Sequence, residues 1–291
     1  MILATFEKFK GKNNTKLSSN FTYRKSSEGG VIGTELEECL NFDITNDGSL
    51  ELRDSFETIL PNQNVITIYK YNDDIYFQTP EGLKKYNLNL QVITTVDTEI
   101  TQQSLAYCEI GGILFYSDGV SLKCIGGKSD PTPDRYDFLA KLPAGNILAY
   151  YMSRLYSIKS KYIFYSEPYK YLWYDTRRNF IPMKERITMF LPTPNGIYLS
   201  TINELYFIRG RKIDEFIIDK IANFGALYGT GQILLDNNIV MFSNKNYICI
   251  GDFNGKILQL DYYKHTDTFN SGVSCVNIKP NKNLVILTLR R

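Results

Sequence analysis

The sequence contains very little of the side-chain chemistry on which most enzymes depend. It has one histidine, His265, and one tryptophan, Trp173, in 291 residues. A nucleophile triad or an imidazole metal site is poorly supported by a lone histidine in a polar connection, where a solvated surface group is the more common role. We therefore expect neither kind of site.

The cysteines are too scattered to form a metal site or a disulfide framework. They number five, an odd count, and none belongs to a C-x-x-C pair. They are Cys39, Cys108, Cys124, Cys249 and Cys275. All but Cys39 lie in apolar runs typical of strands, so we expect buried free thiols, which indicate a reducing compartment.

Strong charge and long apolar runs are also missing. The net charge is +2, which is too small to argue for nucleic-acid binding, and basic pairs such as Arg177-Arg178 fit a solvated surface. The N-terminus has no apolar segment of signal-peptide length, and no stretch approaches the length of a membrane span.

Recognisable catalytic and cofactor motifs are absent as well. The glycine-rich stretches at 29–33 and 229–231 have neither the lysine nor the strand–turn–helix setting of a phosphate loop. Ser117-Asp118-Gly119 resembles the start of a sialidase box, but no Thr-Trp follows it, so we interpret it as a turn. Paired carboxylates such as Asp73-Asp74 lie in turns, where solvated charge is the default. The sequence therefore predicts no enzyme activity, no catalytic residue, no metal and no cofactor.

Short alternating runs of apolar residues, rich in aromatics, make up most of the chain. Tyrosine and phenylalanine number 22 and 17, and both favour pleated, half-buried surfaces. Pairs such as Asn72-Asp73, Gly111-Gly112 and Asn254-Gly255 separate the runs and favour tight hairpins. Long segments of helical period are missing, so the fold class is all-β.

The hairpins repeat along the chain. The strands that follow successive turns begin at Ile75, Ile113, Leu155, Ile197 and Ile239, in steps of 38, 42, 42 and 42 residues, and a sixth begins at Leu284. A period near 40 to 45 residues is typical of propeller blades, which bury their faces against one another. We predict a six-bladed β-propeller over residues 39–291; a large sandwich or two small β-domains are the alternatives.

A hairpin near the N-terminus has no blade of its own. Phe42 and Ile44 alternate with polar residues, as do Leu50 and Leu52, on either side of a turn at 46–48. The chain ends inside the sixth repeat, so pairing this hairpin with residues 284–289 would close the ring and remove two exposed edges. Residues 1–38 are polar and basic, and we expect an extended arm that docks on a neighbouring subunit or lies on its own propeller.

The only tryptophan lies in an aromatic cluster. The stretch "SEPYKYLWYD" contains Tyr169, Tyr171, Trp173 and Tyr174. These side chains could form a contact surface for a sugar or a protein. Alternation along a strand favours packing between neighbouring blades instead.

Two stretches resemble structural proteins of tailed bacteriophages. In the first, the matching positions are Phe9, Gly11, Asn13, Asn41, Asp43, Gly48, Ser49, Leu50 and Arg53. Asp54-Ser55 departs from the Pro-Gly or Arg-Gly that is common there. The second runs from Ile163 to Gly210, with an acidic-Pro turn, Trp173 and a hairpin that ends in Arg209-Gly210.

The resemblance is to the β-propeller tail nozzle and packaged-DNA stabilization proteins, especially of short-tailed phages. It implies a non-enzymatic virion protein, assembled in the bacterial cytoplasm, that forms a hexameric ring in the tail or neck below the portal and connector. Such a ring helps to close or line the DNA exit channel, touching other tail proteins and packaged DNA without reading its sequence. Phe9 and Gly11 join the aromatic cluster as interface candidates. A propeller that binds or cleaves host-surface glycans and a cellular scaffold for protein partners are the other hypotheses.

Overall fold

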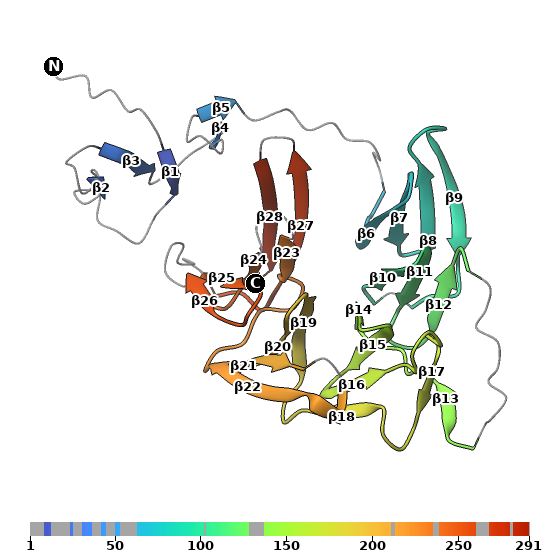
Figure 1. Ribbon diagram of the computed structural model, residues 1–291. Coiled ribbons are helices and arrows are strands. Elements are labelled where there is room, and N and C mark those ends of the chain that lie inside the picture. The colour runs from blue at the N-terminus through green and yellow to red at the C-terminus, as the bar shows by residue number, and fades with distance from the viewer. Residues whose placement is uncertain are drawn as a thin grey trace. The chain divides into compact units, whose positions relative to one another are not determined.

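The computed structural model confirms that the chain is all-β. It describes residues 63–101, 103–127, 137–210, 213–234, 239–259, 268–279 and 282–290, together with five short strands nearer the N-terminus. Strands account for almost all regular structure in these residues, beside one 3₁₀ turn, η2 (Ile213–Glu215) (Figure 1). None of these residues belongs to a helix that could cross a membrane.

Contacts divide the chain into two units, which are described one at a time. Residues Ile59–Lys220 form one unit, and residues Met1–Thr58 and Ile221–Arg291 form the other. This grouping joins the two ends of the chain in one unit. It leaves the proposed division into an arm (1–38) and a propeller (39–291) as a prediction.

The unit Ile59–Lys220 contains four consecutive sheets, and the last strand of the fourth sheet runs two residues past its end. Their strand orders are β6-β7-β8-β9, β10-β11-β12, β14-β15-β16-β18 and β19-β20-β21-β22, and a small β13-β17 pair lies beside the third. The strands are β6 (Thr67–Tyr71), β7 (Asp74–Thr79), β8 (Gly82–Asn87), β9 (Val92–Asp97), β10 (Ala106–Ile110), β11 (Ile113–Ser117), β12 (Leu122–Ile125), β13 (Leu139–Lys141), β14 (Ile147–Tyr151), β15 (Arg154–Lys159), β16 (Tyr162–Tyr165), β17 (Trp173–Asp175), β18 (Phe180–Pro182), β19 (Ile187–Thr193), β20 (Gly196–Thr201), β21 (Leu205–Arg209) and β22 (Ile217–Ala222).

The second unit contains a fifth four-stranded sheet, a long hairpin and the N-terminal strands. The sheet order is β23-β24-β25-β26, and β27 pairs with β28. The strands are β23 (Gln232–Leu234), β24 (Ile239–Ser243), β25 (Ile248–Asp252), β26 (Ile257–Gln259), β27 (Ser271–Lys279), β28 (Lys282–Arg290), β1 (Phe9–Lys12), β2 (Arg24–Lys25), β3 (Val31–Leu36), β4 (Phe42–Ile44) and β5 (Leu50–Leu52). The long hairpin lies beside the sheet, where the Gln232 side chain donates a hydrogen bond to the Ser274 carbonyl at 2.8 Å.

The repeat predicted from the sequence is present. Its aligned positions lie in β7, β11, β15, β20 and β24, which are the second strands of the five successive sheets, and its sixth position lies in β28. The alignment succeeded because a tight turn followed by an apolar strand is a local pattern. The sequence thus located one equivalent strand in each sheet.

The N-terminal hairpin is also present, with Phe42 opposite Leu52 and Ile44 opposite Leu50. Within the described strands, β4-β5 and β27-β28 are separate two-stranded sheets, so the pairing that would close the ring stays a prediction. The segment expected to be an extended arm contains a three-stranded sheet, β1-β3-β2. The expectation of an extended arm with little core of its own stays a prediction.

Apolar side chains from successive sheets of the Ile59–Lys220 unit pack face to face. Leu114 and Tyr116 of β11 pack toward the first sheet, whereas Phe115 between them packs toward the third. This alternation follows from the two-residue period of a strand. Between the third and fourth sheets, Tyr156 stacks on Phe190 with ring centroids 5.3 Å apart. Each inner sheet therefore supplies side chains to two cores.

Buried polar side chains of the first two sheets form hydrogen bonds to the connections that lead from one sheet to the next. The fully buried Gln78 donates to the carbonyls of Thr101 and Gln103, at 3.2 and 2.8 Å, and accepts from the Leu105 amide at 3.0 Å. The buried Ser117 hydroxyl donates to the Gly145 carbonyl at 2.7 Å. Leu105 and Gly145 are buried, so these bonds satisfy an amide and a carbonyl that would otherwise be buried without partners.

We expect Gln78→Ala to lower the free energy of unfolding by about 2–4 kcal/mol, because it leaves the Leu105 amide and two carbonyls without their partner. Chemical denaturation of the wild-type and variant proteins measures the difference. Gln63→Ala is the control, since no hydrogen bond of its side chain is found among the described residues. Equal destabilisation by the two variants would contradict the role assigned to Gln78.

Candidate functional site

The third sheet contains an interruption that the other sheets lack in their described parts. β16 pairs with β18, and the residues between them leave the sheet to form β17, which pairs with β13. We call residues 166–179 the excursion. Its two ends are close together, because the Tyr165 amide donates to the Asn179 carbonyl at 3.1 Å. The excursion therefore leaves the register of the sheet intact.

Backbone and side-chain hydrogen bonds anchor the excursion to the sheet at its start. The amide of Ser166 donates to the Leu155 carbonyl at 2.9 Å, and the Leu155 amide donates to the Ser166 hydroxyl at 3.0 Å. Tyr169 adopts a φ of 59°, and its amide donates to the Ser153 carbonyl at 3.0 Å. The turn at 167–170 is thus held against the β14-β15 hairpin.

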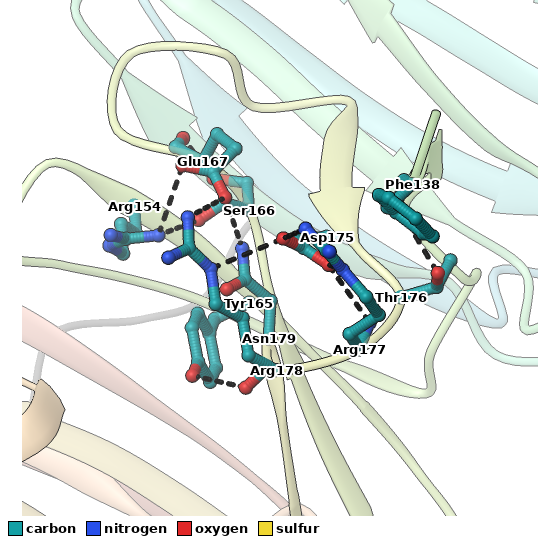
Figure 2. Close-up of polar contacts among 10 residues, drawn as sticks. All are labelled: Phe138, Arg154, Tyr165, Ser166, Glu167, Asp175, Thr176, Arg177, Arg178 and Asn179. Carbon is teal, nitrogen blue, oxygen red and sulfur yellow. Dashed lines mark hydrogen bonds and ion pairs between the residues drawn. The ribbon is translucent and has the colours of Figure 1, made fainter. Parts of the chain in front are cut away.

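Asp175, at the end of β17, is the centre of the polar contacts in Figure 2. Its Oδ1 accepts from the Arg177 amide at 2.9 Å and from Arg177 Nε at 3.2 Å, and its Oδ2 accepts from Arg177 Nη2 at 3.1 Å. Nε of Arg178 lies 3.2 Å from the same Oδ2. One buried carboxylate therefore orients two consecutive arginines.

Hydrogen bonds from Arg177 lower the pKa of Asp175, with a further contribution from the nearby charge of Arg178. The carboxylate is only 6% exposed, whereas the side chains of Arg177 and Arg178 are 58% and 72% exposed. The negative charge is thus held inside and ionised at neutral pH. The positive charge faces the solvent.

Glu167 forms a second, weaker centre at the start of the excursion. Nδ2 of Asn179 donates to its Oε1 at 2.8 Å, and Nη2 of Arg178 lies 3.7 Å from the same oxygen. Nη1 of Arg154 lies 3.9 Å from Oε2 and donates to the Ser166 carbonyl at 2.6 Å. Arg178 therefore bridges the two carboxylates, which are contributed by the two ends of the excursion.

The two centres border an open hollow of about 550 Å³. It is lined by Asp137, Phe138, Leu139, Glu167, Pro168, Lys170, Asp175, Arg177 and Arg178. Phe138 is held there because its carbonyl accepts from the Thr176 amide at 2.9 Å, and the Arg177 guanidinium lies 3.5 Å from the centre of its ring. The hollow thus combines fixed guanidinium groups with an aromatic ring.

This arrangement suits recognition of a ligand or partner. Both oxygens of Asp175 are occupied by arginine, so this carboxylate has little capacity left to accept a proton or a further hydrogen bond. The guanidinium groups still have N–H donors that face the solvent. Planar groups with fixed orientation and unused donors are effective at recognising oxygen acceptors.

The aromatic residues singled out in the sequence fall into two classes. Trp173 is buried, Tyr171 packs edge-on against Phe115, and Tyr174 packs edge-on against Phe164. Their partners belong to β11 and β16 of neighbouring sheets, as the packing interpretation expects. Tyr169 differs, because it is 72% exposed and lies on the turn next to the hollow.

The remaining candidates lie near the N-terminus. Phe9 and Gly11 belong to β1, Asp43 to β4 and Leu50 to β5. Asn41, Gly48 and Arg53 lie outside the described residues. The pairing of β4 with β5 places Asp43 and Leu50 in one hairpin.

Sequence reasoning missed the residues that make the hollow. Arg177-Arg178 was interpreted as a solvated basic pair, and Asp175, Glu167 and Phe138 were not singled out. A usable signal existed: "YDTRRN" concentrates three charges directly after the aromatic cluster. No such signal points to Phe138, because the pairing of β13 with β17 brings it to the hollow from a distant part of the sequence.

Comparison with known proteins shows the fold alone. No protein-family model matches the chain, and no curated protein sequence matches it. The extracellular domain of BT4673 from B. thetaiotaomicron is similar in structure, with a TM-score of 0.53 and 14% identity over 77% of this chain and 31% of that one. This chain therefore spans about a third of that domain. A variant of KlHsv2, in which loop 6CD is replaced by a Gly-Ser linker, gives a TM-score of 0.50 with 9% identity, covering 83% of this chain and 88% of the other.

We expect Trp173→Ala to lower the free energy of unfolding by about 3–5 kcal/mol, because it removes the buried ring that β17 contributes. Tyr169→Ala should change it by less than about 0.5 kcal/mol, because the exposed ring contributes little to the core. Denaturant titration of both variants measures these values. The packing interpretation fails if the effects are equal or reversed.

We expect Asp175→Asn to lower the melting temperature at pH 7. The folded-state pKa of Asp175 is lowered, so its contribution to stability is present above the unfolded pKa of about 3.9 and disappears as pH falls through the folded value. The difference between wild type and variant should therefore shrink below about pH 4. Asp219→Asn, which removes a half-exposed partner of Arg209, is the control and should have a smaller effect. A pH-independent difference would show that the carboxylate charge is not the cause.

Proposed function

We propose that this chain is a non-enzymatic structural protein built on a closed six-bladed β-propeller. The observation that carries the proposal is the series of five equivalent sheets, followed by the β27-β28 hairpin beside the fifth. Successive sheets of the Ile59–Lys220 unit share apolar cores, and packing of this kind suits a component whose purpose is to hold other components in place. If β27-β28 and β4-β5 formed a sixth blade, every sheet would pack against a neighbouring sheet on both faces.

The proposed setting is the virion of a tailed bacteriophage, at the tail nozzle or neck. The support is the resemblance of two stretches, both of which contain the hairpins that the resemblance requires. In the first, β4 pairs with β5 around Asp43 and Leu50. In the second, β20 pairs with β21, which ends at Arg209 before Gly210. A hexameric ring below the portal and connector would place the propellers around the DNA exit channel.

Ring formation requires two different faces of each subunit to meet. The described surface offers exposed apolar side chains at the β8-β9 tip and along β9, including Leu90, Val92 and Ile93 at 74%, 50% and 42% exposed. Exposed apolar groups on an edge strand are typical of protein contacts. They are consistent with a subunit that buries part of this strand in an assembly.

The test of the virion role is direct. Mass measurement in solution and electron microscopy of purified particles should show a ring of the full-length chain, with density on the tail axis below the portal. A ring in solution that is absent from particles would contradict the location. A monomer that never enters particles would overturn the whole proposal.

Deletion of residues 39–59 tests the closure of the propeller. If the hairpin completes the sixth blade, the deleted protein should aggregate or lose its cooperative thermal unfolding, because two sheet edges are left open. Deletion of residues 1–38 is the control, and we expect it to leave cooperative unfolding in place. A soluble, cooperatively folded protein without residues 39–59 would rule out this closure.

Glycan binding is a second candidate function, and the hollow favours it. Phe138 is 48% exposed in the hollow, next to charged side chains, and an aromatic ring beside polar groups suits a sugar. Trp173, the aromatic residue that first suggested sugar binding, is buried. Glycan binding at the hollow is compatible with a structural role for the rest of the chain.

A further inference from the structure

We infer that the hollow binds an acidic sugar through its carboxylate, an inference that rests on the second candidate function, glycan binding. The hollow is bounded by the excursion on one side and by Phe138 on the other. Its volume of about 550 Å³ is within the range of small-molecule sites. Two features select a carboxylate-bearing sugar: the arginine donors that do not contact Asp175 or Glu167, and a half-exposed aromatic ring beside the exposed carboxylate of Asp137.

The unused donors come from Arg177 and Arg178. A guanidinium group has five N–H donors. Arg177 directs Nε and Nη2 at Asp175, and Arg178 directs Nε at Asp175 and Nη2 at Glu167, so Nη1 of each takes no part in these contacts. Both side chains are more than half exposed. Their outer edges can therefore meet a carboxylate.

The two arginines are also oriented before any ligand arrives. Arg177 is fixed by its two bonds to Asp175 and by stacking on Phe138, and Arg178 is fixed by contacts to both carboxylates (Figure 2). A ligand that binds them loses little side-chain entropy on their account. This orientation raises affinity for a planar acceptor more than a pair of mobile lysines would.

The charges of the described residues that line the hollow balance. They are three cations, Lys170, Arg177 and Arg178, and three carboxylates, Asp137, Glu167 and Asp175. A sugar carboxylate, with one negative charge, adds less unbalanced charge to this lining than a terminal phosphate, which carries nearly two at neutral pH.

The other groups in the hollow distinguish a sugar from a simple anion. Asp137 is exposed and can accept hydrogen bonds from the several hydroxyl groups of a sugar, which acetate lacks. Arg177 covers one face of the Phe138 ring, and the half-exposed remainder offers an apolar surface for the C–H face of a sugar. A uronic acid combines these three properties: a carboxylate, several hydroxyls and an apolar face.

Calorimetric titration of the full chain with glucuronic acid, glucose and inorganic phosphate tests the inference. Glucuronic acid should bind at least about tenfold more tightly than glucose, because only it carries the carboxylate. Arg178→Gln should weaken glucuronic acid binding by at least about tenfold without changing the weak binding of glucose. Arg209→Gln is the matched control, since Arg209 is similarly exposed and paired with an aspartate elsewhere. The melting temperature of each variant checks that it is folded.

Each outcome decides the matter. Equal binding of glucose and glucuronic acid would keep glycan binding but overturn the carboxylate site. No binding of either sugar would overturn both. Tighter binding of phosphate than of glucuronic acid would assign the arginines to another ligand and overturn the inference. A uronic-acid oligosaccharide that binds as tightly as glucuronic acid would support a site for one sugar unit. Unchanged binding of glucuronic acid by Arg178→Gln would contradict the inference.

Discussion

The stacking of the sheets depends on how buried backbone groups in the connections are satisfied. Where a connection between two sheets is buried between apolar faces, its amides and carbonyls cannot bond to water. Each unsatisfied group there costs about 1–3 kcal/mol. Gln78 and Ser117 meet this demand from the second strand of their sheets. At Gly145, which Ser117 contacts, an added Cβ would lie 2.4 Å from the Ile158 carbonyl oxygen, so the connection fits only without a side chain. The packing of the apolar cores therefore depends on these few polar contacts.

The excursion solves a different problem, because it places a cluster of charged side chains beside cores that are mostly apolar. Asp175 is nearly buried, yet Arg177 and Arg178 neutralise it from the solvent side, where their own hydration is largely kept. The chain thus obtains fixed guanidinium groups without burying them. The same carboxylate that stabilises the turn also sets the direction of the donors, so local folding and the recognition surface share one cause.

The parts that the sequence predicted are those determined within a few residues. Turn pairs and alternating apolar residues located the second strand of each sheet and the hairpin around Phe42 and Leu52, because both patterns are local. Which strands lie beside that hairpin depends on contacts across the whole chain, and the β1-β3-β2 sheet was missed because β1 and β3 pair in parallel over a long separation. The hollow was missed for the same reason. The charges of Asp175, Arg177 and Arg178 lie together in the sequence, but Phe138 is brought beside them only by the pairing of β13 with β17.

The closeness of the two ends of the excursion has a consequence for how this protein can change. Tyr165 and Asn179 are neighbours through a backbone hydrogen bond, and the Tyr165 hydroxyl donates to the carbonyl of Arg178. The segment is therefore a cassette whose two attachment points are fixed by the scaffold. Its length and its exposed positions can vary at little entropic cost, since closing a somewhat longer loop between fixed ends costs only a few tenths of a kcal/mol. Exchange of those exposed positions between related chains would transfer a binding preference, provided that the packed rings of Tyr171, Trp173 and Tyr174 are kept, because these contribute to the protein's resistance to unfolding.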